Sequence, residues 1–440
     1  MTTLAPGLAF DDAGFARFLE TRRETPAALA ARRAAWETFG RLDWPTRRDE
    51  EWIRTDLRTF HLDRFQLTGG EIGPSEVESF VGGSVLTGSI ELGGQIVSID
   101  GTTVAERIDE RLAAKGVLFQ PLERAVVEHP ELIERYLMTT AYRTDADRFA
   151  ALHAAFWTGG ALLYVPRGVT IEHPLHLLAG IRGGADLSHV LVVLEPGAEA
   201  TLLTEYLSPD DEANGLHCGG IELHVGAGAN LRFVNLQDWG RNVRHFAHQK
   251  ALVDRDASLQ WTIGALGARL AKVNQHVELV GRGATCQVNG VMFTEGRQHL
   301  AYHTLQHHVA PDCRSDFLYK AALQDQSRTV WQGMIKVDPR AQRTDGYQRN
   351  DNLILSSAAR ADSIPGLEIE ADDVRCTHGS TSGRVDEELI FYACSRGFTR
   401  REAVRMIVTG FFQQVFDRIT LESVRDALSE SIAHRVRDLS

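Results

Sequence analysis

A repeat of about 28 residues in the middle of the chain constrains the fold more than any other sequence feature. Small or apolar residues recur with this period directly after a turn residue, at Val169, Ala198, Ala229, Ala257, Ala284, Cys313 and Ala341. The preceding turn residue is glycine in four cases, and glycine adopts positive φ without steric cost. The other three turn residues are Asp256, Asp312 and Arg340. A fixed period of this length indicates stacked units, each of which buries its apolar face only against its neighbours.

The segments between these turns have the length and alternation of β-strands. In the run IELHV, Ile221, Leu223 and Val225 fall on one face of a strand, and Glu222 and His224 on the other. Two residues beyond the small positions, the expected inward-facing residues are Ile171, Ala200, Leu231, Leu259 and Cys286. Because no helical segment interrupts the runs, we predict a mainly β fold whose core is a right-handed parallel β-helix. A large sandwich or barrel is the alternative, but sandwich strands recur at roughly 8–12 residues without a longer period.

Helical patterns flank the repeat region on both sides. Apolar spacing at Asp11–Arg22, Pro26–Phe39 and Pro121–Met138 predicts a mainly helical N-terminal domain over residues 1–155, with a small hairpin at residues 88–97. The β-helix core is expected over residues 156–384, although its period is lost after residue 354. A helical C-terminal domain follows over residues 385–440.

Two apolar helices are predicted near the C-terminus. Thr399 and Glu402 have the spacing of a capping box, which marks a helix start. The apolar residues on the faces of the two helices are Val404, Val408, Phe411, Phe412, Val415 and Ile419, then Leu421, Val424, Leu428, Ile432 and Val436. This apolar surface must pack on the core of the chain itself or on a partner protein.

Net charge argues against two classes of partner. The chain has 47 Lys and Arg against 59 Asp and Glu, for a net charge of −12, which repels nucleic-acid phosphates and anionic lipids. No apolar run approaches the length of a membrane helix, and the first residues lack the pattern of a signal peptide. We therefore expect a cytoplasmic protein without nucleic-acid or membrane partners. In that compartment the five cysteines would be free thiols: Cys218, Cys286, Cys313, Cys376 and Cys394.

Histidines are concentrated in the repeat region, and the segment His299–His308 lies close to Cys313. Imidazole and thiolate suit iron, zinc and copper, and residues four apart share one face of a strand. A corner expected over residues 306–313 would break that alignment. Solvated or hydrogen-bonded histidines on the outer face are therefore the simpler interpretation.

A second cysteine–histidine pair lies further along the chain. Cys376 and His378 are two residues apart, so in a strand both side chains face the same way. Such a pair can bind a transition metal or cluster iron, although a buried cysteine also packs as a small hydrophobe.

Several blocks of sequence together resemble the SufB/SufD family of iron–sulfur cluster assembly proteins. They are PTRRDEEW at Pro45–Trp52, the stretch Ala155–Leu177, SDFLYKAAL, QRTDGYQRNDNLIL at Gln342–Leu355, LEIEADDVRCTHGSTSGRVDEELIFYACSRG and REAVRMIVTGFF. Two positions favour the SufD branch. SufB carries a functional cysteine where this chain has Asn350, and it reads His-Glu where this chain reads His378-Gly379.

The resemblance implies a scaffold subunit rather than an enzyme. It implies that the chain pairs with SufB through the ends of the β-helices and binds the SufC ATPase through its C-terminal helices. His378 matches the SufD histidine at the SufB–SufD interface where the nascent cluster forms, and Cys376 is its neighbour. The cluster or iron would be held transiently and shared with the partner, with none tightly bound to the isolated chain, which could also form a homodimer.

Two other functions stay open on the sequence. A carbohydrate-active β-helix enzyme, a lyase or hydrolase, would need a groove lined with paired carboxylates or a Ca²⁺ site. A free-standing metalloenzyme using the segment His299–His308 would hold stoichiometric metal.

Overall fold

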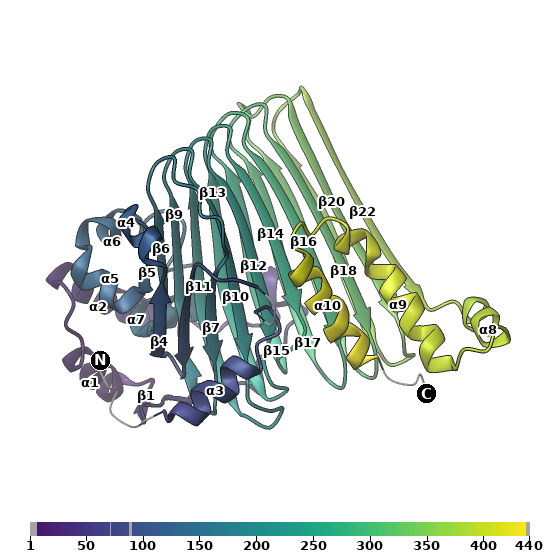
Figure 1. The fold of residues 1–440 in the computed structure, drawn as a ribbon, viewed down its shortest axis with the longest axis horizontal. Coiled ribbons are helices and arrows are strands. Elements are labelled where there is room, and N and C mark those ends of the chain that lie inside the picture. The colour runs from purple at the N-terminus through teal and green to yellow at the C-terminus, as the bar shows by residue number, and fades with distance from the viewer. Residues whose placement is uncertain (1–6, 71, 88–89, 437–440) are drawn as a thin grey trace.

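A computed structural model describes residues 7–70, 72–87 and 90–436 of the chain. Its centre is a parallel β-solenoid of about eight turns over residues 160–384, flanked by an N-terminal helical region and by C-terminal helices (Figure 1). The predicted fold class is thereby confirmed. No helix in this described part of the chain is long and apolar enough to cross a membrane.

Two sheets form the walls of the solenoid, and successive turns pair in parallel. In spatial order the first sheet contains β4 (Thr102–Ile108), β3 (Gly94–Ile99), β7 (Leu175–Gly180), β10 (Glu199–Leu207), β12 (Asn230–Asp238), β14 (Ser258–Ala265), β16 (Thr285–Thr294), β18 (Arg314–Leu323), β20 (Thr344–Ile354) and β22 (Val374–Arg384). The second contains β5 (Leu118–Pro121), β6 (Gly160–Val165), β9 (His189–Leu194), β11 (Gly215–Val225), β13 (Val243–Val253), β15 (Leu270–Leu279), β17 (His299–His308), β19 (Arg328–Val337) and β21 (Arg360–Ile369), with β8 (Ala185–Asp186) beside β11.

The predicted turn positions form one corner of the solenoid. At six of the seven turns the residue before the small position has positive φ: Gly168, Gly197, Gly228, Asp256, Gly283 and Asp312. Each of these residues donates its backbone N–H to a carbonyl of the next turn, which joins the corner into a continuous ladder. The small residues that follow, from Ala198 to Ala341, are buried. The seventh position differs from the prediction, because Arg343 rather than Arg340 has positive φ and donates to Asp373.

The lumen of the solenoid is filled by apolar side chains from both sheets. All five predicted inward-facing residues, from Ile171 to Cys286, are buried in this cluster. Phe233 on β12 and Trp261 on β14 meet there edge to face, with ring centroids 5.4 Å apart. Most inward residues are apolar because each one is covered by the turns on either side.

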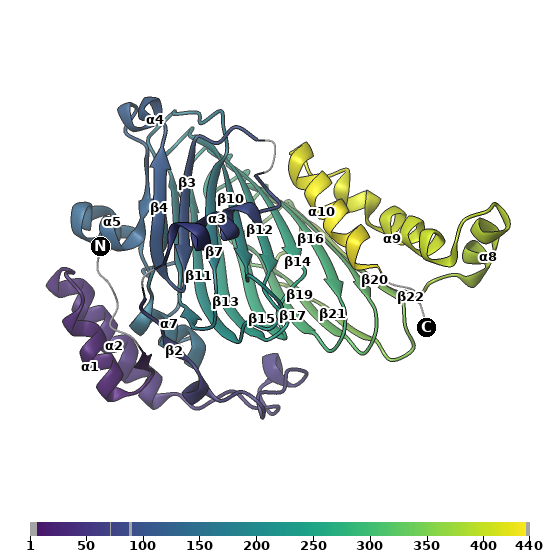
Figure 2. The same cartoon turned by 60° about the horizontal axis from the view of Figure 1, so that its bottom comes forward.

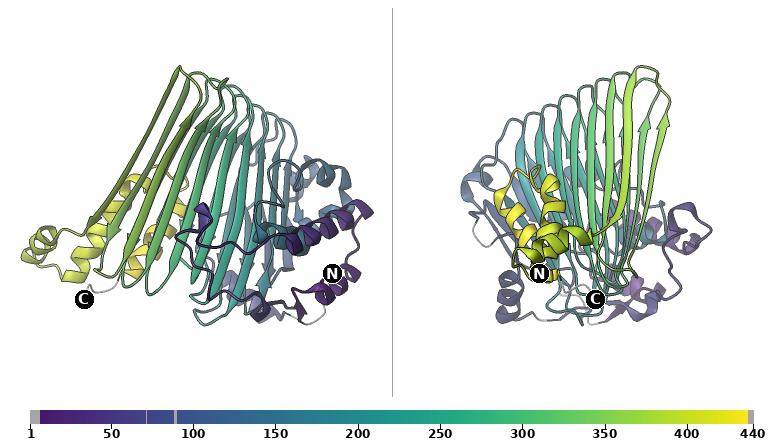
Figure 3. Two further views of the ribbon diagram at one scale, coloured as in Figure 1. Left: turned by 180° about the vertical axis from the view of Figure 1, so that it is seen from behind. Right: turned by 90° about the vertical axis from the view of Figure 1, so that its right-hand side faces the viewer.

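The N-terminal helices cover one end and one side of the solenoid (Figure 3). They are α1 (Asp12–Glu20), α2 (Pro26–Arg41), α3 (Pro74–Gly82), α4 (Glu110–Ala114), α5 (Leu122–Glu128), α6 (Pro130–Tyr136) and α7 (Arg148–Phe156), with short 3₁₀ turns at Glu50–Trp52 and Leu62–Arg64 and a small strand pair, β1 (Leu8–Ala9) with β2 (Gln66–Leu67). The first two lie where the apolar spacing predicted them.

Two N-terminal predictions need correction. The helix expected over Pro121–Met138 is two helices, because Pro130 cannot continue the first helix and starts the second. The hairpin expected at residues 88–97 lies further along the chain, as β3 and β4, and turns at Asp100–Gly101 with positive φ at both residues. Residues 88 and 89 lie outside the described residues.

The C-terminal helices are α8 (Glu387–Ser395), α9 (Arg400–Phe416) and α10 (Glu422–Arg435). Thr399 and Glu402 form the predicted capping box. Helices α9 and α10 lie across the outer face of the first sheet (Figure 2), where Val404, Val408 and Phe412 are buried against strand residues. The predicted apolar stripe therefore packs mainly on the solenoid of the chain itself.

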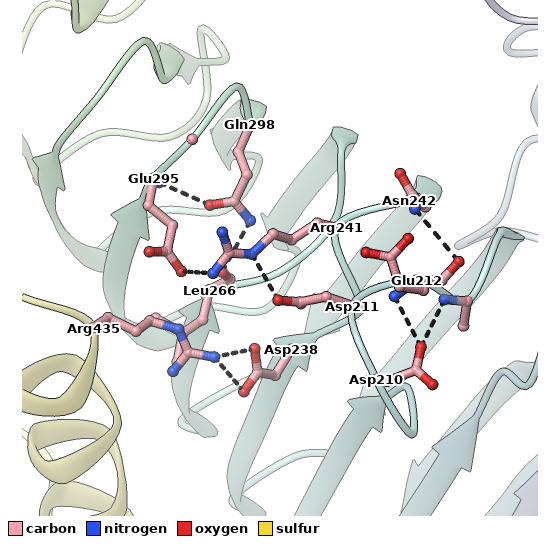
Figure 4. Close-up of polar contacts among 12 residues, drawn as sticks. Asp210, Asp211, Glu212, Asp238, Arg241, Asn242, Leu266, Glu295, Gln298 and Arg435 are labelled. Atoms are coloured by element: carbon pink, nitrogen blue, oxygen red, sulfur yellow. Dashed lines mark hydrogen bonds and ion pairs between the residues drawn. The ribbon is translucent and has the colours of Figure 1, made fainter.

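Polar contacts fix this helical hairpin to the solenoid. Arg435 pairs with Asp238 at 2.6 Å (Figure 4). Lys320 on β18 donates to the Phe411 carbonyl at 2.9 Å, and Arg418 pairs with Asp316. The contacts join α9, the turn that follows it and α10 to two strands, β12 and β18.

Truncating a lumen side chain tests whether the stacked core carries the stability. Phe233→Ala is expected to lower the free energy of unfolding by about 3–5 kcal/mol, because it removes a fully buried ring and leaves a cavity. Chemical denaturation of the variant measures this change. Phe391→Ala, at a side chain that is 75% exposed, is the control and is expected to change stability little. Equal effects of the two changes would contradict the packing described above.

Candidate functional site

The C-terminal end of the solenoid is uncovered, in contrast to the N-terminal end. Strands β21 and β22 are the last strands of their sheets, and most residues of β22 are exposed (Figure 3). At the other end Leu112, Val117 and Phe119 are buried in the same apolar cluster as the lumen residues and close it. A bare edge strand leaves N–H and C=O groups available for pairing with another chain.

The lumen changes from apolar to polar toward this open end. Along one inward column, Val288, Phe317, Gln348 and His378 follow one another on adjacent strands. The neighbouring columns change in the same way, from Gly290 and Tyr319 to Asn350 and Ser380, and from Met292 and Ala321 to Asn352 and Ser382. The mouth of the lumen is therefore a polar surface supported by an apolar core.

Cys376 and His378 lie at this mouth on β22. They pair in register with Gly346 and Gln348, so both occupy inward positions of the last turn, as their spacing predicted. Cys376 is half-buried against Ile335 and its neighbours, and burial raises the pKa of its thiol. His378 is exposed, and within the described residues its imidazole has no hydrogen-bond or ion-pair partner.

A third side chain reaches the same place from the lumen. The Cys376 Sγ lies 3.2 Å, and the His308 Nε2 3.6 Å, from the point where a Cβ on Gly346 would lie. The missing side chain of Gly346 thus leaves room for the thiol and the imidazole to approach. His308 is fully buried, and this burial lowers its pKa to about 3, so the ring is neutral.

Hydrogen bonds fix the orientation of the His308 ring. Its Nε2 lies 2.8 Å from the Ser315 hydroxyl, which in turn donates to the Gln306 Oε1 at 2.6 Å. This network assigns the proton of the ring to Nε2, and among the described residues the buried Nδ1 has no hydrogen-bond partner. Sequence reasoning missed His308 as a neighbour of Cys376, because only the register of the turns brings the two together.

The described residues contain no group of three or more His, Cys, Asp or Glu side chains that could hold a metal ion. Cys376 and His378 offer one thiol and one imidazole, whereas an iron–sulfur cluster generally takes four protein ligands. On their own, these two side chains fall short of such a ligand set.

The segment His299–His308 does not form a compact site. It is extended throughout as β17, and the corner predicted over residues 306–313 begins only after His308, at residues 309–313. His299, His303 and His307 share a face, but positions four apart on a strand are separated by roughly 13 Å. His307 pairs with Asp338 at 2.8 Å and with Glu278 at 3.6 Å, and these carboxylates raise its pKa. These contacts favour a structural role for His307.

The junction between α10 and the solenoid contains a cavity of about 260 Å³ with three carboxylates (Figure 4). Arg241 pairs with Asp211 at 2.9 Å and with Glu295 at 2.8 Å, and Arg435 pairs with Asp238. Carboxylates held in ion pairs are poorly placed as the acid and base of a glycosidase. This cavity gives no support to a carbohydrate-active enzyme.

A second exposed surface lies on α8 and the start of α9, which stand clear of the strands (Figure 1). Phe391 is 75% exposed and Tyr392 is 59% exposed, and Leu389, Phe398 and Met406 are exposed beside them. Of the residues of α8, only Ile390 is buried. Apolar residues on several sides of a short helix, with so little covered, indicate a docking surface.

Comparison with known proteins places the chain in context. The model of the SufBD core domain of the SUF system for FeS cluster assembly matches residues 177–411, and that of the SufBD N-terminal region matches residues 19–177. Iron–sulfur cluster assembly SufBD family proteins of Mycobacterium leprae and Mycobacterium tuberculosis are 32% and 33% identical over 66% of this chain, and the aligned parts cover 75% and 74% of those proteins. One from Staphylococcus saprophyticus is 27% identical over 75% of this chain and 71% of its own length.

Alkylation of the thiols tests the environment of Cys376. All five cysteines are free, and Cys218, Cys286 and Cys313 are buried, whereas Cys394 is exposed. Iodoacetamide is therefore expected to modify Cys394 first, Cys376 more slowly and the other three only after unfolding. Because burial raises the pKa of Cys376, its rate should rise about tenfold per pH unit below that pKa as thiolate forms. Peptide mass spectrometry reports each site.

The Cys376→Ser variant identifies the modified peptide in this experiment. Modification of Cys376 as fast as that of Cys394 at pH 7 would contradict the half-buried position.

Proposed function

The chain belongs to the SufBD family of the SUF system for iron–sulfur cluster assembly, and on this premise we propose that it is the SufD-type scaffold subunit. Asn350 supports the SufD branch. It lies in the lumen one turn inside the mouth, at the position where SufB carries a functional cysteine, and it offers an amide in place of a thiol. Sulfur would then be received by the partner subunit.

The observation that carries the proposal is the bare last turn with Cys376 and His378 at its mouth. A sister chain of the same fold, SufB, can extend both sheets by pairing with β21 and β22, and would cover the polar lumen. Without that partner, a second copy of this chain could occupy the same edge. Either arrangement would bury the polar mouth at an interface between two solenoids.

The nascent cluster or iron is the cargo of this interface. His378 would provide an imidazole and Cys376 a thiolate, while SufB would provide the remaining ligands. The raised pKa of Cys376 means that iron binding must displace a proton from the thiol. Held by ligands from two chains, the cargo would be bound transiently, with none tightly bound to the isolated chain.

The exposed surface of α8 is proposed as the site for the SufC ATPase. Helix α9 follows α8 in the chain. The Phe411 carbonyl of α9 accepts a hydrogen bond from the Lys320 ammonium, which also lies 3.6 Å from the Asp351 carboxylate of β20. Asp351 is adjacent to the lumen residues Asn350 and Asn352. A movement of the ATPase could therefore reach the strand next to β22 through packed, hydrogen-bonded contacts.

This assignment carries three further proposals. Residues 1–155, 156–384 and 385–440 would be the N-terminal, scaffold and ATPase-binding domains. The chain would catalyse no turnover of its own, since ATP hydrolysis would belong to SufC. It would act in the cytoplasm.

Replacing the interfacial imidazole tests the cargo site. His378→Ala is expected to leave pairing with SufB intact but to lower the iron retained by the co-purified complex at least roughly tenfold, since even outer-sphere changes weaken metal sites by that factor. His434→Ala is the control, because this histidine is exposed on α10 and pairs at 3.4 Å with Glu430 of the same helix. Unchanged iron and sulfide content in the His378 variant would remove this residue from the proposed site.

The ATPase contact is tested by surface changes, because deleting residues 385–440 would also uncover the face of the first sheet that α9 and α10 bury. Phe391→Ser with Tyr392→Ser is expected to weaken capture of SufC at least about 30-fold, the effect of losing an interface hot spot. Val127→Ser, at an exposed apolar residue of α5, is the control. Full SufC binding by the double variant would place the contact elsewhere.

A further inference from the structure

The N-terminal region contains a cavity of about 810 Å³ that the proposed function does not use. It lies beneath the segment 45–58, which includes the PTRRDEEW block. Aromatic and basic side chains dominate its lining: Phe10, Phe39, Trp44, Phe60, Arg47, Arg48, Arg58 and Arg148. The volume is in the range of sites for small organic ligands.

The lining is basic although the segment around it is not. Residues 41–64 contain equal numbers of acidic and basic residues. Asp56 forms a bidentate pair with Arg58, and Asp49 accepts from the backbone N–H of Thr46, so these acids are occupied. Arg47, Arg48 and Arg148 then face Asp63 as the remaining charges of the lining. In a chain with a net charge of −12, a basic cavity selects for anions.

Arg148 is the key side chain of this cavity. Its guanidinium lies 4.3 Å from the centroid of the Phe39 ring and 4.7 Å from that of Trp44. Its Nη1 donates to the Leu42 carbonyl at 2.9 Å, whereas its buried Nε has no hydrogen-bond partner in the part of the chain that the structure describes. Within the described residues, no carboxylate oxygen lies within 4.0 Å of this guanidinium.

Asp43 favours the charged form of Arg148, but within the described residues it forms no ion pair with it, so Arg148 lacks a direct counter-ion. Leu42 is the C-cap of α2, and the C-terminus of a helix carries a partial negative charge that holds the guanidinium in place. A helix end supplies only about half an elementary charge, so a bound anion would complete the neutralisation. Burial lowers the pKa of Arg148, in agreement with this unmet need.

Thr55 gives a second, independent indication of a ligand. This residue lines the cavity and is only 2% exposed, yet its hydroxyl has no hydrogen-bond partner within the described residues. A buried hydroxyl without a partner is costly, and a ligand oxygen would satisfy it.

We propose that this cavity binds a small organic anion that combines a phosphate group with a planar ring, as in a nucleoside monophosphate. The phosphate would pair with Arg148 and with Arg47 or Arg48, since guanidinium groups bind phosphate with two parallel hydrogen bonds. The aromatic wall of Phe39, Trp44 and Phe60 would contact the ring. The site is confined to the N-terminal region and stands apart from the assignment of Cys376, His378 and α8.

Calorimetric titration of the full-length chain tests this site, with AMP, adenosine and inorganic phosphate as probes. AMP is expected to bind at least about tenfold more tightly than either adenosine or phosphate, because it satisfies both the basic and the aromatic parts of the lining. GMP and UMP, measured in parallel, show whether one base is preferred.

Two variants localise the binding. Arg148→Gln is expected to weaken AMP binding about tenfold or more, the usual effect of losing a hydrogen bond to a charged group, while glutamine can still donate to the Leu42 carbonyl. Arg47→Gln, at the exposed rim, is expected to weaken binding with little effect on folding, because the change removes only one exposed hydrogen bond, to the Ile53 carbonyl. Arg255→Gln, at an exposed turn of the solenoid, removes one positive charge elsewhere and should leave AMP binding unchanged.

Three results would overturn the proposal. They are the absence of binding by all three nucleotides, equal affinity for phosphate and AMP, and unchanged AMP binding in both cavity variants. Circular dichroism shows whether each variant is folded. Loss of binding in the Arg148→Gln variant is therefore interpreted only beside the result for Arg47→Gln.

Discussion

The structure depends on backbone pairing between successive turns of the solenoid. At the corner, residues from Gly168 to Arg343 each donate an N–H to the following turn, and the strands pair in parallel along both walls. Such a stack satisfies every internal turn but cannot satisfy its own ends. Leu112, Val117 and Phe119 close the lumen at the N-terminal end. Strands β21 and β22 leave the other end open, and that asymmetry determines where a partner can bind.

The same constraint explains the chemistry of the lumen. Phe317 is covered by turns on both sides and is apolar, whereas the next residues of its column are polar: Gln348, which is still buried, and then His378, which is exposed at the mouth. Polar groups near the mouth can hydrogen-bond within the chain, as the Gln348 amide does with the Gly366 carbonyl. Others, such as His378, are exposed and accessible to a partner protein. A binding site is thus placed where the stack ends, without disturbing the core.

The sequence predicted the solenoid because glycine and small residues recur wherever a turn is covered on both sides. The period was lost after Ile354, although the solenoid continues to Arg384, because the uncovered last turn does not require buried small residues. Helix patterns were reliable where caps such as Thr399 were present, and failed at Pro130, which divides one apolar stripe into two helices.

The candidate site was only partly predictable for a related reason. The spacing of Cys376 and His378 was enough to place both on one face of a strand. The approach of His308 to Cys376 depends on which turns are adjacent and on the missing side chain of Gly346. Neither can be predicted from a local sequence pattern. The exposed aromatics of α8 were also missed, since apolar residues in a predicted helix indicate burial until the packing of that helix is known.

Amide hydrogen exchange of β22 tests the central claim, that the open end of the solenoid is completed by a sister chain. In the isolated chain at low concentration, where self-association is minimal, the amides of Val374–Arg384 that point away from β20 should exchange rapidly. Addition of SufB should slow the exchange of these amides strongly while the lumen strands β12 to β16 change little. Binding of SufB with unchanged exchange in β22 would contradict the account.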